Sequence, residues 1–256
     1  MISALKAEFR KLFTVRSTYV ITGLAFLAIG FVSFYAEGLK GGAISGPNAN
    51  LYLVSSITQH SAVISLLGAL VALLLLTHEY RYNTITYTLA AANSRSKVLL
   101  AKIVAVFVYI FGFAVVSGIV GLICITMGMA IAGHVLPQQD ISFVTYLGKM
   151  VFYCEGWALA ALLFAALFRN QVAVIAILLI GPNTTEVLLS LFLKNRAVYL
   201  PFTALSQVIA PPSASGFSGL AANTTLSPMR GAFVFCVYLV VGWAVTWLLF
   251  MKRDAS

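Results

Sequence analysis

The chain has 256 residues, of which 61% are apolar and only 9% are charged, and its formal net charge is +9. Soluble domains carry about 25% charged residues, and a chain of this length buries only about three quarters of its surface on folding. The composition therefore excludes a water-soluble domain, and its high apolar content excludes a disordered chain. We predict an integral membrane protein.

The N-terminal segment, 1–17, is expected to form an amphipathic helix at the membrane surface. Apolar residues recur there at helical spacing, and the polar residues, among them Glu8 and Lys11, are assigned to the opposite face. A basic polar face suits a helix that lies in the inner interface of the bilayer. Two roles stay open for it, an anchor that orients the first span or a lever that transmits motion.

Six apolar runs follow, each close to or above the roughly 20 residues needed to cross a hydrocarbon core about 30 Å thick. The runs are continuous and lack the alternating pattern of barrel strands, so they predict helices. The sequence thus predicts an all-α integral membrane protein with six transmembrane helices: Thr18–Tyr35, Ile57–Thr77, Ile103–Ala132, Tyr146–Phe168, Val172–Leu193 and Arg230–Met251.

The positive charges indicate the orientation. Eleven of the 16 Lys and Arg residues lie in residues 1–17, 78–102 and 252–256 or at Arg169. Basic residues concentrate on cytoplasmic loops, so both termini are expected in the cytoplasm, with the chain as a multi-pass protein of the plasma membrane. No basic stripe interleaved with exposed aromatic residues is present, so nucleic acid is not an expected partner.

Residues 78–102 form the most patterned loop, HEYRYNTITYTLAAANSRSKVLLAK. A short cytoplasmic helix is expected here, with Tyr80, Thr84 and Tyr87 on one side. Ser94 follows Asn93 as a start signal for the next helix. Lys102, within that helix, is expected to extend back to the interface.

The segment before the last span is expected on the outside. Within residues 194–229, the apolar stretch 198–209 is too short to cross the membrane and predicts a re-entrant hairpin. We assign the whole chain to one transmembrane domain: residues 1–17 as the amphipathic helix, 18–77 as the first two spans, 78–102 as the cytoplasmic segment, 103–193 as spans three to five, 194–229 as the exterior segment, and 230–256 as the last span and tail.

The sequence contains no P-loop motif and no metal-ligand spacing among its three histidines, so neither ATP binding nor a metal site is expected in this chain. Gly216–Gly219 resembles the Gly-x-Ser-Gly of rhomboid proteases, but no histidine follows His134 to activate the serine. Acidic residues inside apolar runs usually mark function. Glu155 and Glu186, the latter beside Asn183 and Thr184, are candidates for a translocation path or gate, unless both are simply solvated at the outer interface.

The cytoplasmic loop resembles the loop between the second and third spans of ABC-2 type transporter permeases. The resemblance rests on Glu79–Ile85, Thr88-Leu89 and Ser94–Lys102, with Asn83 where glycine is frequent in that family. Asn also tolerates turn conformations. The expected amphipathic helix at 1–17 is similar to the family's membrane-parallel connecting helix.

The resemblance implies the membrane half of an ATP-driven exporter, itself without an ATPase site. Its partners would be two P-loop ATPase subunits, which carry the ATP and Mg²⁺, a second permease of the same or a related kind, and membrane lipid. The loop would be the coupling helix, and a hydrophobic or amphipathic cargo is expected. The alternative is a stand-alone ion-coupled carrier or channel that uses Glu155 and Glu186. The residues implied to contact the ATPase are Glu79, Tyr80, Arg81, Thr84, Leu89 and Arg95.

Overall fold

The computed structural model of the chain describes residues 2–40, 48–92, 94–134, 143–210 and 226–252. Every regular element in these ranges is a helix. In chain order they are α1 (Ile2–Leu12), α2 (Arg16–Phe31), the π-helix η1 (Val32–Leu39), α3 (Asn48–Arg81), α4 (Ile85–Ala92), α5 (Arg95–Ile131), α6 (Phe143–Phe168), α7 (Gln171–Ile180), the π-helix η2 (Gly181–Thr185), α8 (Glu186–Leu193), the 3-10 helix η3 (Lys194–Tyr199), α9 (Pro201–Ile209) and α10 (Pro228–Lys252).

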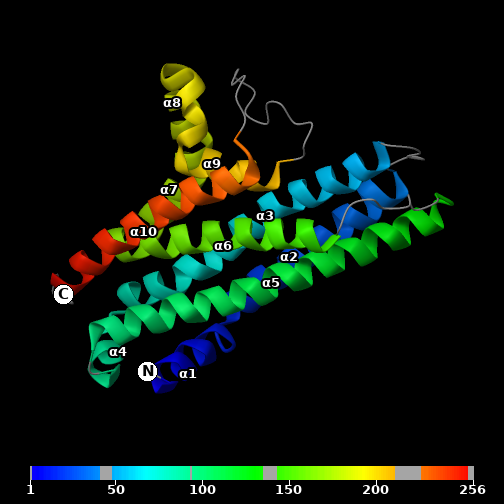
Figure 1. Cartoon of the computed structure of the whole chain (residues 1–256). Helices are drawn as coiled ribbons and strands as arrows, with labels where there is room; N and C mark the ends of the chain where they lie inside the picture. Colours follow the sequence, from blue (N-terminus) through cyan, green and yellow to red (C-terminus); the bar gives the residue numbers. More distant parts are fainter. Residues whose placement is uncertain (1, 41–47, 93, 135–142, 211–225, 253–256) are drawn as a thin grey trace.

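Five helical stretches in the described part of the chain are long and apolar enough to cross a membrane. They correspond to five of the six expected runs: Arg16–Leu39, His60–Arg81, Arg95–Ile131, Phe143–Phe168 and Pro228–Lys252. They run in a broadly common direction, and α6 lies between α3, α5 and α10 (Figure 1). Fully buried alanines such as Ala161 and Ala165 line α6 and allow its neighbours to approach closely.

The expected fifth span, Val172–Leu193, is not one regular helix. It is divided into α7, η2 and α8, and Pro182 lies in the π-helical turn. Proline removes a backbone donor and disrupts the regular helical ladder, which accounts for the break. In Figure 1, α8 stands at a steep angle to the long helices. A sixth crossing therefore stays a prediction.

The first span also departs from regular α-helix, because its C-terminal part, Val32–Leu39, forms η1. η1 packs against α5 at a point where two glycines meet. A Cβ atom added to Gly128 would lie within van der Waals overlap of the Phe34 carbonyl oxygen, and one on Gly38 would lie 2.7 Å from the Gly128 Cα. This backbone contact requires glycine at both positions.

The segment before the last span returns to the bundle. α9 packs against α6 and α10 and buries Ala204, Leu205, Val208 and Ile209. The apolar stretch 198–209 thus lies against protein over much of its length. Its depth in a membrane, and hence the expected re-entrant hairpin, stays a prediction. Residues 211–225, including Gly216–Gly219, lie outside the described part of the chain.

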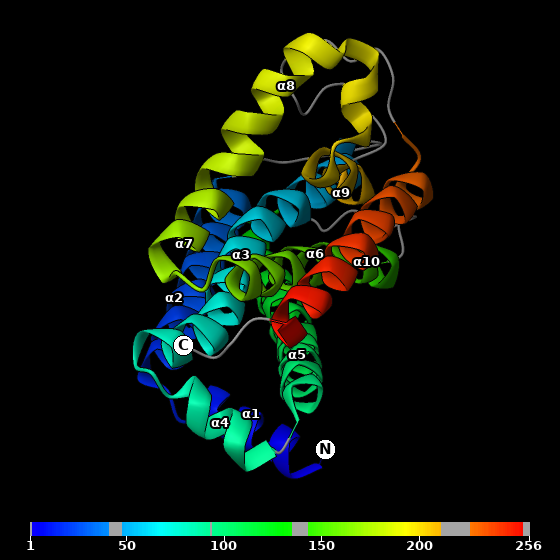
Figure 2. The same cartoon turned by 90° about the vertical axis from the view of Figure 1, so that its left-hand side faces the viewer.

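One end of the bundle gathers the short helices of the N-terminal half. α1 and α4 lie there, near the junction of α3 with α5, and the first and last described residues lie toward the same end (Figures 1 and 2). α1 packs on α5 and buries Leu12 in the core. This arrangement places the patterned loop of the sequence next to the N-terminal helix.

Candidate functional site

The turn between α3 and α4 lies at this end of the bundle. We call residues 81–87, which include this turn and the start of α4, the tip. Asn83 has a φ of 54°, the left-handed conformation that favours glycine, and the expectation that Asn here tolerates a turn is confirmed. The Thr84 backbone N–H donates to the Glu79 carbonyl oxygen at 2.9 Å and closes the end of α3. α4 begins at Ile85, so Tyr80 belongs to α3 and not to the short helix that the sequence predicted.

The outer surface of this tip is polar and aromatic. Arg81, Tyr82, Thr84 and Tyr87 are exposed, whereas Ile85 is buried against the core. Tyr87 is 77% exposed although it is a large aromatic residue. Exposed aromatic and arginine side chains on a short ordered helix are typical of protein contact surfaces.

Glu79 is directed inward from the same turn and does not lie on that surface. Its Oε1 accepts hydrogen bonds from Lys102 Nζ at 2.7 Å and from Lys11 Nζ. Lys102 Nζ also donates to Glu8 Oε2 at 2.9 Å and to the Leu75 carbonyl oxygen at 3.3 Å. We call Glu8, Lys11, Glu79 and Lys102 the charge cluster; it joins α1, α3 and α5.

Two expectations about these residues are wrong. Lys102 does not extend back to the interface, because its side chain is fully buried. Glu8 does not lie on the polar face of α1 either. It follows Leu5 and precedes Leu12 by about one helical turn each, so the helical period places it on the buried face, where it is 2% exposed.

Lys11 completes the neutral charge balance of the cluster. Its Nζ lies 2.8 Å from Glu8 Oε1 and also contacts Glu79. Burial by itself would lower the pKa of Lys11, but hydrogen bonds and Coulombic attraction from Glu79 and Glu8 together raise it. Two carboxylates and two ammonium groups therefore compensate one another, as buried charges must.

The turn between α6 and α7 supports the tip from a second direction. The Arg169 guanidinium lies 5.3 Å from the centre of the Tyr80 ring. Arg81 Nη1 donates to Gln171 Oε1 at 3.5 Å. Asn170 caps α7 by accepting hydrogen bonds from the backbone N–H groups of Val172 and Ala173. The end of α3 is thus held by α1 and α5 on one side and by the start of α7 on the other.

The other residues singled out in the sequence lie in α4, at the start of α5 and in η2. Ser94 is the N-cap of α5 and accepts from the Lys97 backbone N–H at 3.5 Å, so the predicted helix start is confirmed. Arg95 follows it as a half-buried residue. Leu89 in α4 and Asn183 in η2 are on described backbone, but their side chains lie outside what the structure describes.

Glu186, predicted for a gate, caps another helix. Its carboxylate accepts from the backbone N–H groups of Phe202 at 2.8 Å and Thr203 at 2.7 Å, and from the Thr203 hydroxyl at 2.7 Å. These groups are at the N-terminus of α9, where the helix dipole favours an anion. Glu186 is 7% exposed, so it is not simply solvated, whereas Thr184 nearby is exposed.

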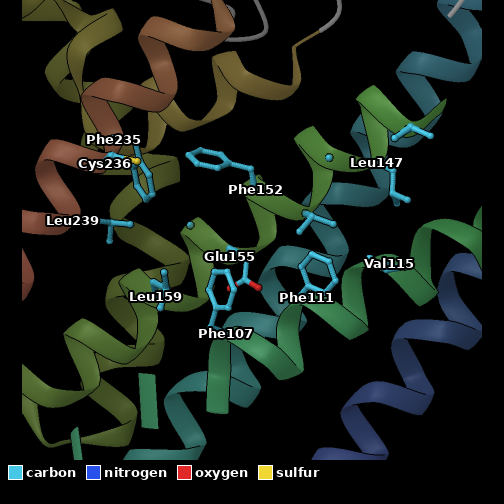
Figure 3. Close-up of a pocket in the computed structure, with 14 residues that line it drawn as sticks. Phe107, Phe111, Val115, Leu147, Phe152, Glu155, Leu159, Phe235, Cys236 and Leu239 are labelled. Atoms are coloured by element: carbon cyan, nitrogen blue, oxygen red, sulfur yellow. The ribbon is translucent and has the colours of Figure 1, made fainter. Parts of the chain in front are cut away.

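Glu155 occupies a different environment. It is 6% exposed, and it forms no ion pair with any of the described residues. It lies in the wall of a cavity of about 490 Å³ between α5, α6 and α10 (Figure 3). Glu186 lines a separate cavity that shares no residue with this one. The structure therefore does not bring the two acids together in one path.

Sequence reasoning missed Glu8, Lys11 and Lys102 as members of one site. A signal was present, because a lysine inside an apolar run and a glutamate on an apolar helix face each require a partner. What the sequence did not contain is the packing of α1 on α5 that brings them together.

The sequence matches the family described as ABC-2 family transporter protein over residues 4–182. The matched region includes α1 from its first turn, the tip, the whole charge cluster and Glu155. No protein with a curated function matches the sequence.

Proposed function

Because this chain belongs to the ABC-2 transporter family, a family of ABC transporter membrane subunits, we propose that it is the permease subunit of an ATP-driven exporter. Two separate P-loop ATPase subunits would bind ATP and Mg²⁺ and contact the tip. A second permease, either another copy or a related chain, would complete the pair. In this arrangement the chain spans the plasma membrane, and the tip and both termini lie on its cytoplasmic side.

The observation that carries this proposal is the division of the loop into an exposed surface and a buried anchor. Arg81, Thr84 and Tyr87 offer side chains to a partner, while Glu79 in the same turn is held by the charge cluster. A partner that pushes on the tip would therefore move α3 together with α1 and α5. Such rigid-body movement of packed helices is a common means of transmitting a conformational change.

The predicted contact residues divide into two roles in this proposal. Arg81, Thr84, Leu89 and Arg95 would meet the ATPase directly. Glu79 would hold the end of α3 against α1 and α5 through the charge cluster. We place Tyr80 in the second group, because its ring is half-buried under Arg169.

The cargo we propose is hydrophobic or amphipathic. The five long helices expose many large apolar side chains, and few charges lie inside them. A membrane domain of this kind offers little to solvate a strongly polar molecule in transit. Members of the family that the sequence resembles mostly export drugs, antimicrobial peptides, lipids or glycans.

Affinity purification of the tagged chain from native membranes tests the proposal. We expect a P-loop ATPase to co-purify, and the chain alone to hydrolyse no ATP. Arg81→Glu should lower transport, because it reverses a charge on the exposed tip. ATP hydrolysis by the partner should continue, and the charge cluster is not altered. Lys252→Glu is the matched control, since it reverses an exposed charge at the end of α10. Absence of any ATPase from the purified material would refute the proposal.

The carrier alternative receives no support from the geometry. A coupled pair would need Glu155 and Glu186 near one path, whereas they line separate cavities. The carboxylate of Glu186 is already occupied by three donors at the start of α9. ATP-independent, proton-driven flux that is lost in both Glu155→Gln and Glu186→Gln would restore this alternative.

A further inference from the structure

The cavity between α5, α6 and α10 is lined almost entirely by apolar side chains. Its 14 lining residues are Phe107, Phe111, Val115, Val144, Leu147, Gly148, Val151, Phe152, Glu155, Gly156, Leu159, Phe235, Cys236 and Leu239. Its volume of about 490 Å³ lies within the range of about 300–1,000 Å³ that is usual for drug-sized ligands. Glu155 is its only acidic or basic residue among those that the structure describes.

Glu155 is unusual among the buried acids of the described residues. Glu8 and Glu79 pair with lysines, Glu37 lies 3.2 Å from His60, and Glu186 caps α9. Glu155 forms no ion pair and accepts no side-chain hydrogen bond within the same part of the chain. A buried carboxylate without a cationic partner is costly, so its place in a cavity wall points to a cation that completes it.

The walls around Glu155 suit an organic cation. The rings of Phe107 and Phe111 lie on either side of the carboxylate, and Phe152 and Phe235 line the same cavity farther from it (Figure 3). Aromatic faces attract cations, most strongly where water is excluded. The cavity therefore combines one acidic group, aromatic rings and apolar volume, which are the features that recognise a lipophilic monocation.

The depth of Glu155 distinguishes between two possible sources of the cation. α6 runs from Phe143 to Phe168, and Glu155 lies midway along it. At a rise of about 1.5 Å per residue, roughly 18 Å of helix separates Glu155 from either end. A phospholipid ammonium group stays in the headgroup region and does not reach this depth. A compact molecule that dissolves within the hydrocarbon does.

The cavity also opens in the direction from which such a molecule would come. Phe107, Phe111 and Cys236 are exposed on the outer surface of the bundle. On helices that cross a bilayer, an apolar surface of this kind would meet lipid. We propose that the cavity between α5, α6 and α10 is a binding site for lipophilic monocations, which enter from the membrane and pair with Glu155. The proposal goes beyond the coupling function, since binding here needs neither the tip nor an ATPase.

Binding of radiolabelled tetraphenylphosphonium to the purified full-length chain in detergent tests this inference. We expect saturable binding that unlabelled tetraphenylphosphonium displaces and that tetraphenylborate, of the same shape but opposite charge, does not. Glu155→Gln should weaken the affinity at least tenfold. Glu186→Gln should leave it unchanged, because that acid lines the other cavity. Thermal melting of each variant checks that it is folded.

A second measurement needs no variant. Cys236 lines the cavity and is exposed, so it reports occupancy through its rate of alkylation by N-ethylmaleimide, followed by mass spectrometry. Tetraphenylphosphonium should slow alkylation of Cys236, and tetraphenylborate should not.

Three results would overturn the proposal: no saturable binding, equal competition by the anion, or unchanged affinity in Glu155→Gln. Equal competition would show a groove for lipid chains that does not select charge. Because the test uses no ATPase, each of these failures leaves the proposed permease function in place.

Discussion

The charge cluster and the cavity around Glu155 differ in whether their buried acidic groups have oppositely charged partners. In the cluster, Glu8, Lys11, Glu79 and Lys102 neutralise one another across three helices. In the cavity, one carboxyl group lies among apolar walls and forms no ion pair with the described residues. Burial alone therefore does not define a role. A compensated charge holds helices together, and an uncompensated one in a cavity indicates a ligand.

The largest effect is expected from Lys102→Met. This substitution leaves Glu8 and Glu79 buried without the ammonium group that lies between them. Removing one partner from a buried ion pair costs about 3–5 kcal/mol. Unfolding in mixed micelles with increasing SDS measures this loss of free energy of unfolding.

The compensated nature of the cluster can be tested in the same background. Combining Lys102→Met with Glu79→Gln leaves one carboxylate, on Glu8, and one ammonium group, on Lys11, whose charged atoms lie 2.8 Å apart. We expect the double variant to recover a large part of the lost stability, because neutral groups are far less costly to bury than unpaired charges. A double variant less stable than Lys102→Met would show that the four residues do not act as a compensated set.

The sharpest comparison makes the same substitution at one acid of each region. Glu79→Gln should lower the free energy of unfolding by about 1.5–3 kcal/mol, the usual value of hydrogen bonds to charged groups. Glu155→Gln should lower it much less, because no ion pair within the described residues is lost. Unfolding in mixed micelles compares the two directly. If Glu155→Gln were as destabilising as Glu79→Gln, the carboxylate would have a structural role and the distinction between the regions would fail.

Much of the helical architecture was predictable from the sequence. Five apolar runs correspond to long helices because runs of this length and composition leave the backbone few alternatives in lipid. Local turn chemistry was equally readable, as Asn83 and Ser94 show. The resemblance of the loop predicted the family correctly, and the match covers residues 4–182.

Long-range contacts were not predictable in the same way. Glu186 caps α9, which begins only at Pro201, and no local pattern indicates that cap. The charge cluster joins residues separated by up to 94 positions. The irregularity at Pro182 was visible in the sequence, but the π-helical turn that it occupies was not. Single-residue signals thus showed which residues needed partners, and only the fold shows which partners they have.

Glu186 provides a case between the two regions, since its carboxylate is buried but its partners are neutral donors. Glu186→Gln keeps one oxygen, which can accept from only one of the two backbone N–H groups of α9, because these donate to different oxygens of the carboxylate. We expect a loss of about 1–3 kcal/mol in the free energy of unfolding, since the other donor is left unsatisfied. A loss as large as that of Lys102→Met would mean that the charge itself, and not the hydrogen bonding, holds α9 in place.

The smallest effect on stability is expected at the exposed tip, where the proposed function is most sensitive. Arg81 donates one long hydrogen bond to Gln171 and lies 5.7 Å from the centre of the Tyr82 ring. Exposed contacts of this kind contribute little, so Arg81→Ala should change the free energy of unfolding by less than about 0.5 kcal/mol. Transport by the complex with its ATPase should nevertheless fall, because a partner contact is lost. A stable variant with reduced transport would separate the contact surface from the anchor beneath it, whereas a marked loss of stability would place Arg81 with Glu79 among the residues that hold the tip.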